Sequence, residues 1–135
     1  MASFSPAELD YLMGERRFGR VATVDAAGQP HVVPVGWWRY NPELGTIDIT
    51  GHNLPASKKF RNVRANPKVA FVVDDMASID PWRPRAVMIQ GRAEAVEVQG
   101  DAETDAVIRI LPAKIVSWGL DGLDRESESG GAGTT

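Results

Sequence analysis

The chain contains no cysteine among its 135 residues, and it has only two histidines. Without cysteine it has no disulfide bond, no zinc site built on thiolates and no thiol nucleophile. Two histidines alone make a poor metal site, so we expect no bound metal. A Gly-x-Ser-x-Gly elbow and a glycine-rich phosphate loop are missing as well. Their absence argues against hydrolase and P-loop chemistry.

Long apolar segments are also lacking, because no run approaches the roughly 20 residues that span a bilayer. Glu8 and Asp10 stand where a signal peptide would be basic and then apolar, so we expect a cytoplasmic protein that binds no membrane. The formal net charge is −3, whereas nucleic-acid binding requires a broad basic surface. We therefore expect no nucleic-acid partner.

The remaining composition is typical of a small globular domain with many turns, since it is 43% hydrophobic and includes 13 glycines. We predict one domain over residues 1–120, followed by a disordered acidic and Gly/Ser-rich tail over 121–135. Ser5 and Glu8 form a capping box at the start of the first predicted helix.

Hydrophobic periodicity and turn residues place the predicted elements. The predicted helices cover residues 6–16, 56–65 and 101–111, the last ending before Pro112. The predicted strands cover residues 20–24, 31–40, 46–50, 69–73, 85–98 and 114–120. The first three strands form a meander, residues 74–84 form a loop, and Gly91 marks a bulge. Six strands with few helices predict a mostly β fold, a small antiparallel barrel.

A strongly basic segment runs from Ser57 to Arg64 and carries four positive charges. No carboxylate occurs between Asp48 and Asp74, although the chain holds 18. Solvated helix faces usually mix charges of both signs, so this segment favours a binding site for an anion. The alternative interpretation is a solvated basic helix without a ligand.

The position of these charges on the predicted helix supports the anion site. Lys58 and Lys59 lie in the first turn, where backbone N–H groups are unpaired and the helix dipole is positive. Ser57 can add a hydroxyl donor, and Arg61 follows Lys58 on the same face. His52 opens the preceding loop and is a further candidate for ligand contact. A phosphate-bearing ligand is the interpretation we favour.

A second candidate feature is Pro34, which stands inside a predicted strand between Val33 and Val35. Proline cannot donate to a strand ladder, so it leaves neighbouring backbone groups without strand partners. A planar heterocycle with carbonyl and ring N–H groups can use such backbone groups. The alternative is an edge strand in which proline prevents aggregation.

Trp37 and Trp38 are neighbours in the same predicted strand, so their side chains point to opposite faces. One core cannot bury both rings, and a ligand or a second subunit must cover one of them. With Trp82 and Trp118 also present, a homodimer that buries aromatic surface between its subunits is the simplest explanation.

Five segments occur in an order that is typical of a known family. They are Gly19–Val24, Gly28–Val35, Ser57–Val63, Asn66–Ala70 and Ile89–Ala93. The chain resembles the pyridoxamine 5′-phosphate oxidase-like proteins over about residues 5–120, and most of all their branch of F420-dependent flavin/deazaflavin oxidoreductases. This resemblance implies a six-stranded antiparallel split β-barrel of the FMN-binding type. It also implies a homodimer with two cofactor sites at the subunit interface.

The resemblance also suggests roles for individual residues. The lysine that matches Lys59 binds the cofactor phosphate, helped by the residues that match Ser57 and Lys58. The segment around Arg61 and Asn62 supports that site. Many relatives carry arginine where this chain has Ser57, so one phosphate contact is either missing here or supplied by Lys58.

The strand that matches Val32 to Val35 lies along the flavin or deazaflavin ring in such proteins. The loop that matches the residues around Trp82 often comes from the second subunit, and Trp37 and Trp82 then shape the pocket or the interface. The implied activity is hydride transfer from coenzyme F420 to an unidentified small organic substrate. An FMN-dependent oxidase or reductase is one alternative, and a protein that only binds or sequesters the cofactor is another. We assign no acid or base.

Overall fold

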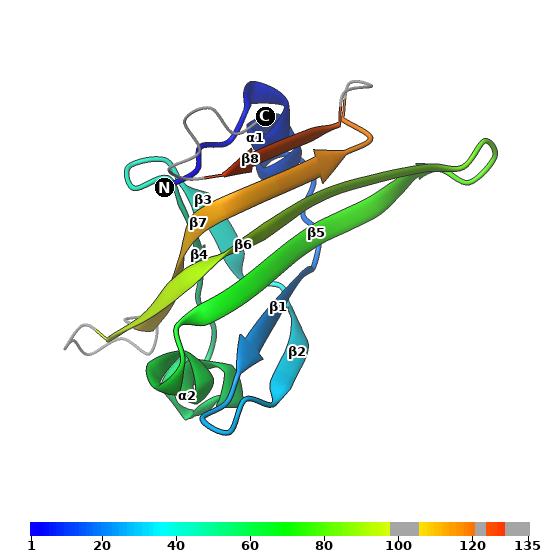
Figure 1. Ribbon diagram of the computed structural model, residues 1–135. Helices are drawn as coiled ribbons and strands as arrows, with labels where there is room; N and C mark the ends of the chain where they lie inside the picture. The colour runs from blue at the N-terminus through cyan, green and yellow to red at the C-terminus, as the bar shows by residue number, and fades with distance from the viewer. Residues whose placement is uncertain (98–105, 121–123, 129–135) are drawn as a thin grey trace.

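Figure 1 shows the computed structural model, which describes residues 1–97, 106–120 and 124–128. The helical elements are α1 (Pro6–Met13), the 3-10 turn η1 (Leu54–Ala56) and α2 (Lys58–Ala65). The strands are β1 (Gly19–Val24), β2 (Pro30–Val35), β3 (Trp38–Asn41), β4 (Thr46–Ile49), β5 (Lys68–Ser78), β6 (Arg83–Glu97), β7 (Ala106–Trp118) and β8 (Arg125–Glu128). None of the helices in these ranges has the length and hydropathy to span a bilayer.

The strands form one curled antiparallel sheet, in the order β2-β1-β5-β6-β7-β4-β3, with β8 paired to β7. Three long strands, β5, β6 and β7, run the length of the molecule, and the short strands curl away from them at either end of the sheet (Figure 1). The predicted mostly β, split-barrel architecture is therefore confirmed.

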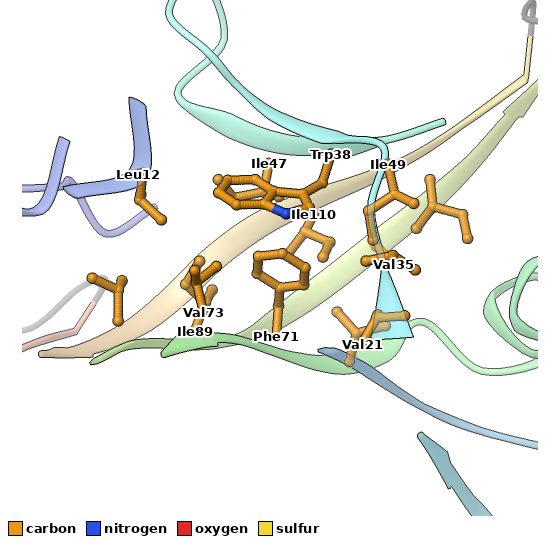
Figure 2. Packing of buried hydrophobic residues seen from close by; sticks show 14 of the residues in the cluster. Leu12, Val21, Val35, Trp38, Ile47, Ile49, Phe71, Val73, Ile89 and Ile110 are labelled. Carbon is orange, nitrogen blue, oxygen red and sulfur yellow. The ribbon is translucent and has the colours of Figure 1, made fainter. Parts of the chain in front are cut away.

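Buried side chains from both ends of the sheet meet in the hydrophobic core (Figure 2). Trp38 of β3 packs edge-on against Phe71 of β5, with ring centroids 5.4 Å apart. The Trp38 indole N–H donates to the carbonyl of Arg17, so its polar atom is satisfied although the ring is buried. Trp37 is 61% exposed, which confirms that the two neighbouring tryptophans point in opposite directions.

The predicted strand over 31–40 and the meander are wrong, because the chain divides at Gly36 and Trp37 into β2 and β3. These two strands lie at opposite edges of the sheet. The carbonyls of the link find partners outside a ladder: Arg16 donates to Gly36 and Trp38, at 3.1 and 2.9 Å, and the Thr50 amide donates to Trp37. The carbonyl groups at the break are therefore satisfied through other elements.

The predicted helix over 101–111 is wrong for residues 106–111, which form the first half of β7; residues 101–105 lie outside the described ranges. Ala106, Ile108 and Ile110 are buried and alternate with less buried neighbours, which is the period of a strand. Pairing with β6 thus outweighs the local helical pattern. The bulge predicted at Gly91 is confirmed, because the register shifts there opposite Pro112.

Two other boundaries need correction. β5 continues to Ser78 and β6 begins at Arg83, so the predicted loop over 74–84 is a turn of residues 79–82. Within the predicted disordered tail over 121–135, Arg125–Glu128 form β8; residues 121–123 and 129–135 lie outside the described ranges. Buried Glu8 holds β8 in place, because its carboxylate accepts from Arg125 Nε at 3.2 Å and from Ser117 Oγ at 2.6 Å. Within the described ranges these changes give eight strands where six were predicted.

A polar cluster fastens α1 to the long hairpin of β5 and β6. The Asp75 carboxylate accepts from Arg17 Nε at 2.8 Å, from Arg85 Nε at 2.9 Å and from the Tyr11 hydroxyl at 2.9 Å. Burial alone would raise the pKa of Asp75, but these hydrogen bonds outweigh it and lower the pKa to about 2. Asp75 is therefore ionised in the folded protein at neutral pH.

Candidate functional site

The basic helix predicted from the sequence is α2, and one face of it packs into the hydrophobic core. Phe60 and Val63 are buried, and Ser57 is the N-cap. The Ser57 hydroxyl accepts from the Phe60 amide at 3.3 Å and donates to the Leu54 carbonyl at 2.6 Å. Because the hydroxyl proton is used in this way, Ser57 shapes the first turn of α2. A direct phosphate contact from Ser57 stays a prediction.

Lys59 is the half-buried cation of the first turn. Burial lowers the pKa of its ammonium group, because water is partly removed from the charge. No side chain or backbone group in the described ranges forms a hydrogen bond or an ion pair with this ammonium. A partly desolvated charge without a partner is unfavourable, and an anionic ligand would supply the missing interaction.

Lys58 is exposed and faces the turn between β1 and β2. The pKa of Asp25 in that turn is lowered, chiefly by the Gln29 amide, with a further contribution from the positive charge of Lys58. The first turn of α2 is therefore close to the start of β2. This closeness brings the two predicted site features, the basic turn and the proline-containing strand, to one end of the sheet.

The next two predicted residues of α2 are held by the protein itself. Arg61 Nη1 donates to the Ala56 carbonyl at 3.0 Å, so this exposed guanidinium closes the turn before the helix. Asn62 is buried, and its amide donates to Thr23 Oγ1 of β1 at 3.0 Å. Asn62 therefore positions α2 against β1, and a direct cofactor contact by its side chain stays a prediction.

β2 is an edge strand, with β1 on one side and no strand on the other within the described residues. Val35 is buried, Val33 packs partly on the core, and Pro34 is exposed opposite Arg20. A cavity of about 430 Å³ opens on the outward side of this strand. It is lined by Phe18, Arg20, Val32, Val33 and Pro34.

Phe18 and Arg20 were not recognised as site residues from the sequence. They flank Gly19 and lie on the outward face of the strand, whereas Gly19 and Val21 are buried. Phe18 is 64% exposed, which is unusual for so large an apolar side chain. The alternation of exposed and buried residues in β1 is the signal that could have identified them.

The remaining predicted residues, His52, Trp37 and Trp82, lie outside both α2 and β2. His52 is exposed in the segment before η1, and Trp37 lies beside Gly51 in the same region. Trp82 is 71% exposed in the turn between β5 and β6. Figure 1 shows this turn projecting at the end of the molecule opposite α2. One chain alone therefore does not bring Trp82 to the lysines.

Comparison with known proteins places this arrangement in a family. The sequence profile described as pyridoxamine 5′-phosphate oxidase matches residues 5–132. The chain belongs to the pyridoxamine 5′-phosphate oxidase family. The match extends the predicted resemblance, drawn over about residues 5–120, through β8.

Individual members of this family and of its fold agree with the assignment. A 5a,11a-dehydrotetracycline/5a,11a-dehydrooxytetracycline reductase of Streptomyces rimosus is 46% identical over 123 residues, which are 88% of this chain and 85% of the relative. Two solved structures share the fold. An F420 reductase has a TM-score of 0.56 at 22% identity, covering 76% of this chain and 91% of its own. An FAD-binding protein of Mesorhizobium loti has a TM-score of 0.63 at 20% identity, covering 93% and 96%.

The chain is thus an oxidoreductase of the pyridoxamine 5′-phosphate oxidase family. The expected class of cofactor, a flavin or a deazaflavin, stays a prediction, because these two solved structures show a shared fold alone. The basic first turn of α2 and the edge strand β2 are the candidate site for that cofactor.

Proposed function

We propose that this protein is a homodimeric reductase that uses coenzyme F420 to reduce a carbon–carbon double bond conjugated to a carbonyl in a polycyclic substrate. The observation that carries the proposal is Lys59, a half-buried cation without a partner in the described chain, at the start of a helix whose net charge is strongly positive. The 46% identical relative, which reduces dehydrotetracyclines by name, supports the substrate class.

The residues at this site fit a phosphorylated cofactor. Lys59 would take the phosphate, and exposed Lys58 would add a second positive charge. The backbone of Val33, Pro34 and Val35 would hold the edge of the ring, because β2 has no neighbouring strand on its outer side in the described chain. When bound, the reduced deazaflavin supplies the hydride. The second hydrogen arrives as a proton, for which we assign no side chain.

The substrate surface that we propose is apolar and shallow. Phe18, Val32 and Pro34 line the 430 Å³ cavity beside β2, and Arg20 is its one charged member. A flat fused-ring compound buries apolar area against such side chains. Arg20 Nη1 donates to the Asp74 carboxylate at 2.5 Å, so it is the remaining N–H groups of this guanidinium that suit an enolate or carbonyl oxygen. The relative's named substrates are compounds of this kind.

The homodimer is part of the proposal because a row of side chains crosses the outward face of the sheet. Strand register places Pro34, Arg20, Val72, Met88 and Val116 side by side on five neighbouring strands. A second copy of the chain would cover the apolar part of this row, from Val72 to Val116, beside the cavity at Pro34 and Arg20. Trp82, which is far from α2 in its own chain, would then reach the cofactor site of the partner.

Fluorescence titration of the purified protein with F420 and with FMN tests the cofactor. We expect F420 to bind and FMN to bind at least tenfold more weakly, since the longer anionic tail of F420 can follow the charges of α2. Retention of FMN through desalting would instead establish the flavin alternative. Reduced F420 should then be oxidised when 5a,11a-dehydrotetracycline is added. Tight F420 binding without oxidation by this compound or by a panel of enones and quinones would establish a binding protein.

The oligomeric state is tested separately by analytical ultracentrifugation. We expect a dimer, and we expect Met88→Glu to dissociate it, because a charge would be buried between Val72 and Val116 in the apolar part of the row. Arg39→Ala is the matched surface control, since Arg39 is exposed on β3 at the other edge of the sheet. A monomeric wild-type protein would contradict the proposed assembly.

A further inference from the structure

One ring nitrogen of His31 is buried and lacks a hydrogen-bond partner, which is unusual. Nδ1 is buried, and it is the one buried side-chain N or O atom in the described ranges without a partner. Buried polar atoms nearly always have one. Nε2 also has no partner among the described residues, but it is not buried and can therefore reach a ligand.

This difference between the two nitrogens determines where the proton of the neutral ring resides. A buried N–H without an acceptor is poorly tolerated, whereas a nitrogen with an unused lone pair is less costly. We therefore place the proton on Nε2. His31 consequently presents an N–H donor on its accessible side.

Strand register shows where this donor lies. His31 pairs with Thr23 across the β1–β2 hairpin, so the two side chains share one face. Thr23 accepts the hydrogen bond from Asn62 of α2, so this is the face that α2 covers. Val33 follows two residues later on the same face of β2. His31 therefore lies on the side of β2 that faces α2, two residues before Val33.

We propose that His31 Nε2–H donates a hydrogen bond to a hydroxyl oxygen of the polyhydroxylated chain that joins the ring of the cofactor to its phosphate. The inference rests on the proposed function, which puts the phosphate on Lys59 and the ring along Val33 to Val35. The chain between ring and phosphate must then pass His31. FMN and the deazaflavin coenzyme share this chain, so the proposal holds for either. His31 binds the cofactor and takes no part in hydride transfer.

Three probes separate the parts of the cofactor in a fluorescence titration of the full-length protein. They are complete F420, the same deazaflavin riboside without its phosphate, and an N10-methyl deazaflavin that lacks the hydroxylated chain. We expect His31→Ala to weaken binding of the first two equally, by about 2- to 12-fold, which is the net value of one neutral hydrogen bond. Binding of the N10-methyl ring should not change.

Two conservative variants show which nitrogen is used. Gln places an amide N–H near the position of Nε2, whereas Asn places one near Nδ1. We therefore expect His31→Gln to restore most of the affinity and His31→Asn to restore little. Rescue by Gln also demonstrates that the loss in His31→Ala does not arise from misfolding.

Several results would overturn the assignment. A loss confined to the phosphorylated probe would mean that His31 binds the phosphate, and an equal loss for all three probes would mean that it only supports the fold. Rescue by Asn rather than Gln would show that the proton is on Nδ1. A wild-type protein that binds none of the three probes would refute the proposed function together with this inference. An unchanged affinity of His31→Ala for probes that the wild-type protein binds would refute this inference alone.

Discussion

Replacing Lys59 by alanine should separate cofactor affinity from stability, because the lysine is a poor contributor to the fold. Its ammonium is partly desolvated, and burial lowers its pKa without compensation from a partner in the described chain. Removing the charge therefore relieves an unfavourable burial. We expect the free energy of unfolding of Lys59→Ala to stay within about 0.5 kcal/mol of the wild-type value or to rise.

The effect on cofactor binding should be much larger. A charge-assisted hydrogen bond to phosphate contributes about 1.5–3 kcal/mol, so the dissociation constant should rise by roughly 12- to 150-fold. Half-burial favours the upper part of this range, since water screens the interaction less than at an exposed site. Because the pKa of Lys59 is lowered, affinity should also begin to fall at a lower alkaline pH than an exposed lysine, with its ordinary pKa of 10.5, would give.

Fluorescence titration across pH 6–10 measures affinity, and urea denaturation of the same samples measures stability. Lys58→Ala is the informative neighbour, because the same charge is removed from an exposed position and should cost less affinity. Arg39→Ala on the opposite edge of the sheet should leave affinity unchanged. An unaltered dissociation constant in Lys59→Ala would refute our placement of the phosphate. So would a loss of affinity accompanied by an equal loss of stability.

Three further predictions concern the framework that holds the site. Asn62→Ala should lower the free energy of unfolding by about 1–3 kcal/mol, because the buried Thr23 hydroxyl loses its partner; an unchanged urea midpoint would contradict this. Gly91→Ala should lower the free energy of unfolding by roughly 1–3 kcal/mol, because the added Cβ would lie 2.1 Å from the Leu111 carbonyl oxygen. Gly36→Ala is the control in the same thermal unfolding experiment and should be tolerated, because the nearest atom to its added Cβ is 3.4 Å away. Since the folded pKa of Asp75 is about 2 and its ordinary value is 3.8, the unfolded state binds more protons between these values. Stability should therefore fall by about 1–2 kcal/mol as pH drops from about 4 to 2, and Asp75→Asn should show a shallower acid dependence over the same range.

Local chemistry in the sequence was sufficient to predict the first helix and the basic helix that carries the candidate site. The capping box of Ser5 and Glu8 is present, with the Ser5 amide donating to Glu8 Oε1 at 2.8 Å. The basic helix was predicted from its spacing of Phe60 and Val63 and from the proline that follows it, and α2 agrees closely. These features depend on interactions within a few residues of the chain, which a sequence displays directly.

What could not be predicted depends on contacts between distant segments. Ala106 to Leu111 have an apolar spacing that suits a helix, and only pairing with β6 makes them a strand. The break at Gly36 and Trp37 depends on Arg16, about 20 residues earlier, which binds the carbonyls of the link. The hydrogen bond of Asn62 could not be predicted either, because its partner Thr23 is 39 residues away, and only the family resemblance gave Asn62 a role at the site. Strand β8 is short and acidic, and its position depends on pairing with β7 and on Arg125, which donates to Glu8 and to the Ser3 carbonyl.

The division between β2 and β3 leaves the sheet with an open edge at each of these strands. The two outermost strands of the sheet are joined there by a peptide link of two residues rather than by a ladder, while the interior strands are paired on both sides. An edge of this kind retains main-chain groups that no neighbouring strand occupies. A small molecule that lies along the outer edge of β2 can thus form hydrogen bonds with these main-chain groups. The sheet does not need to open to receive it.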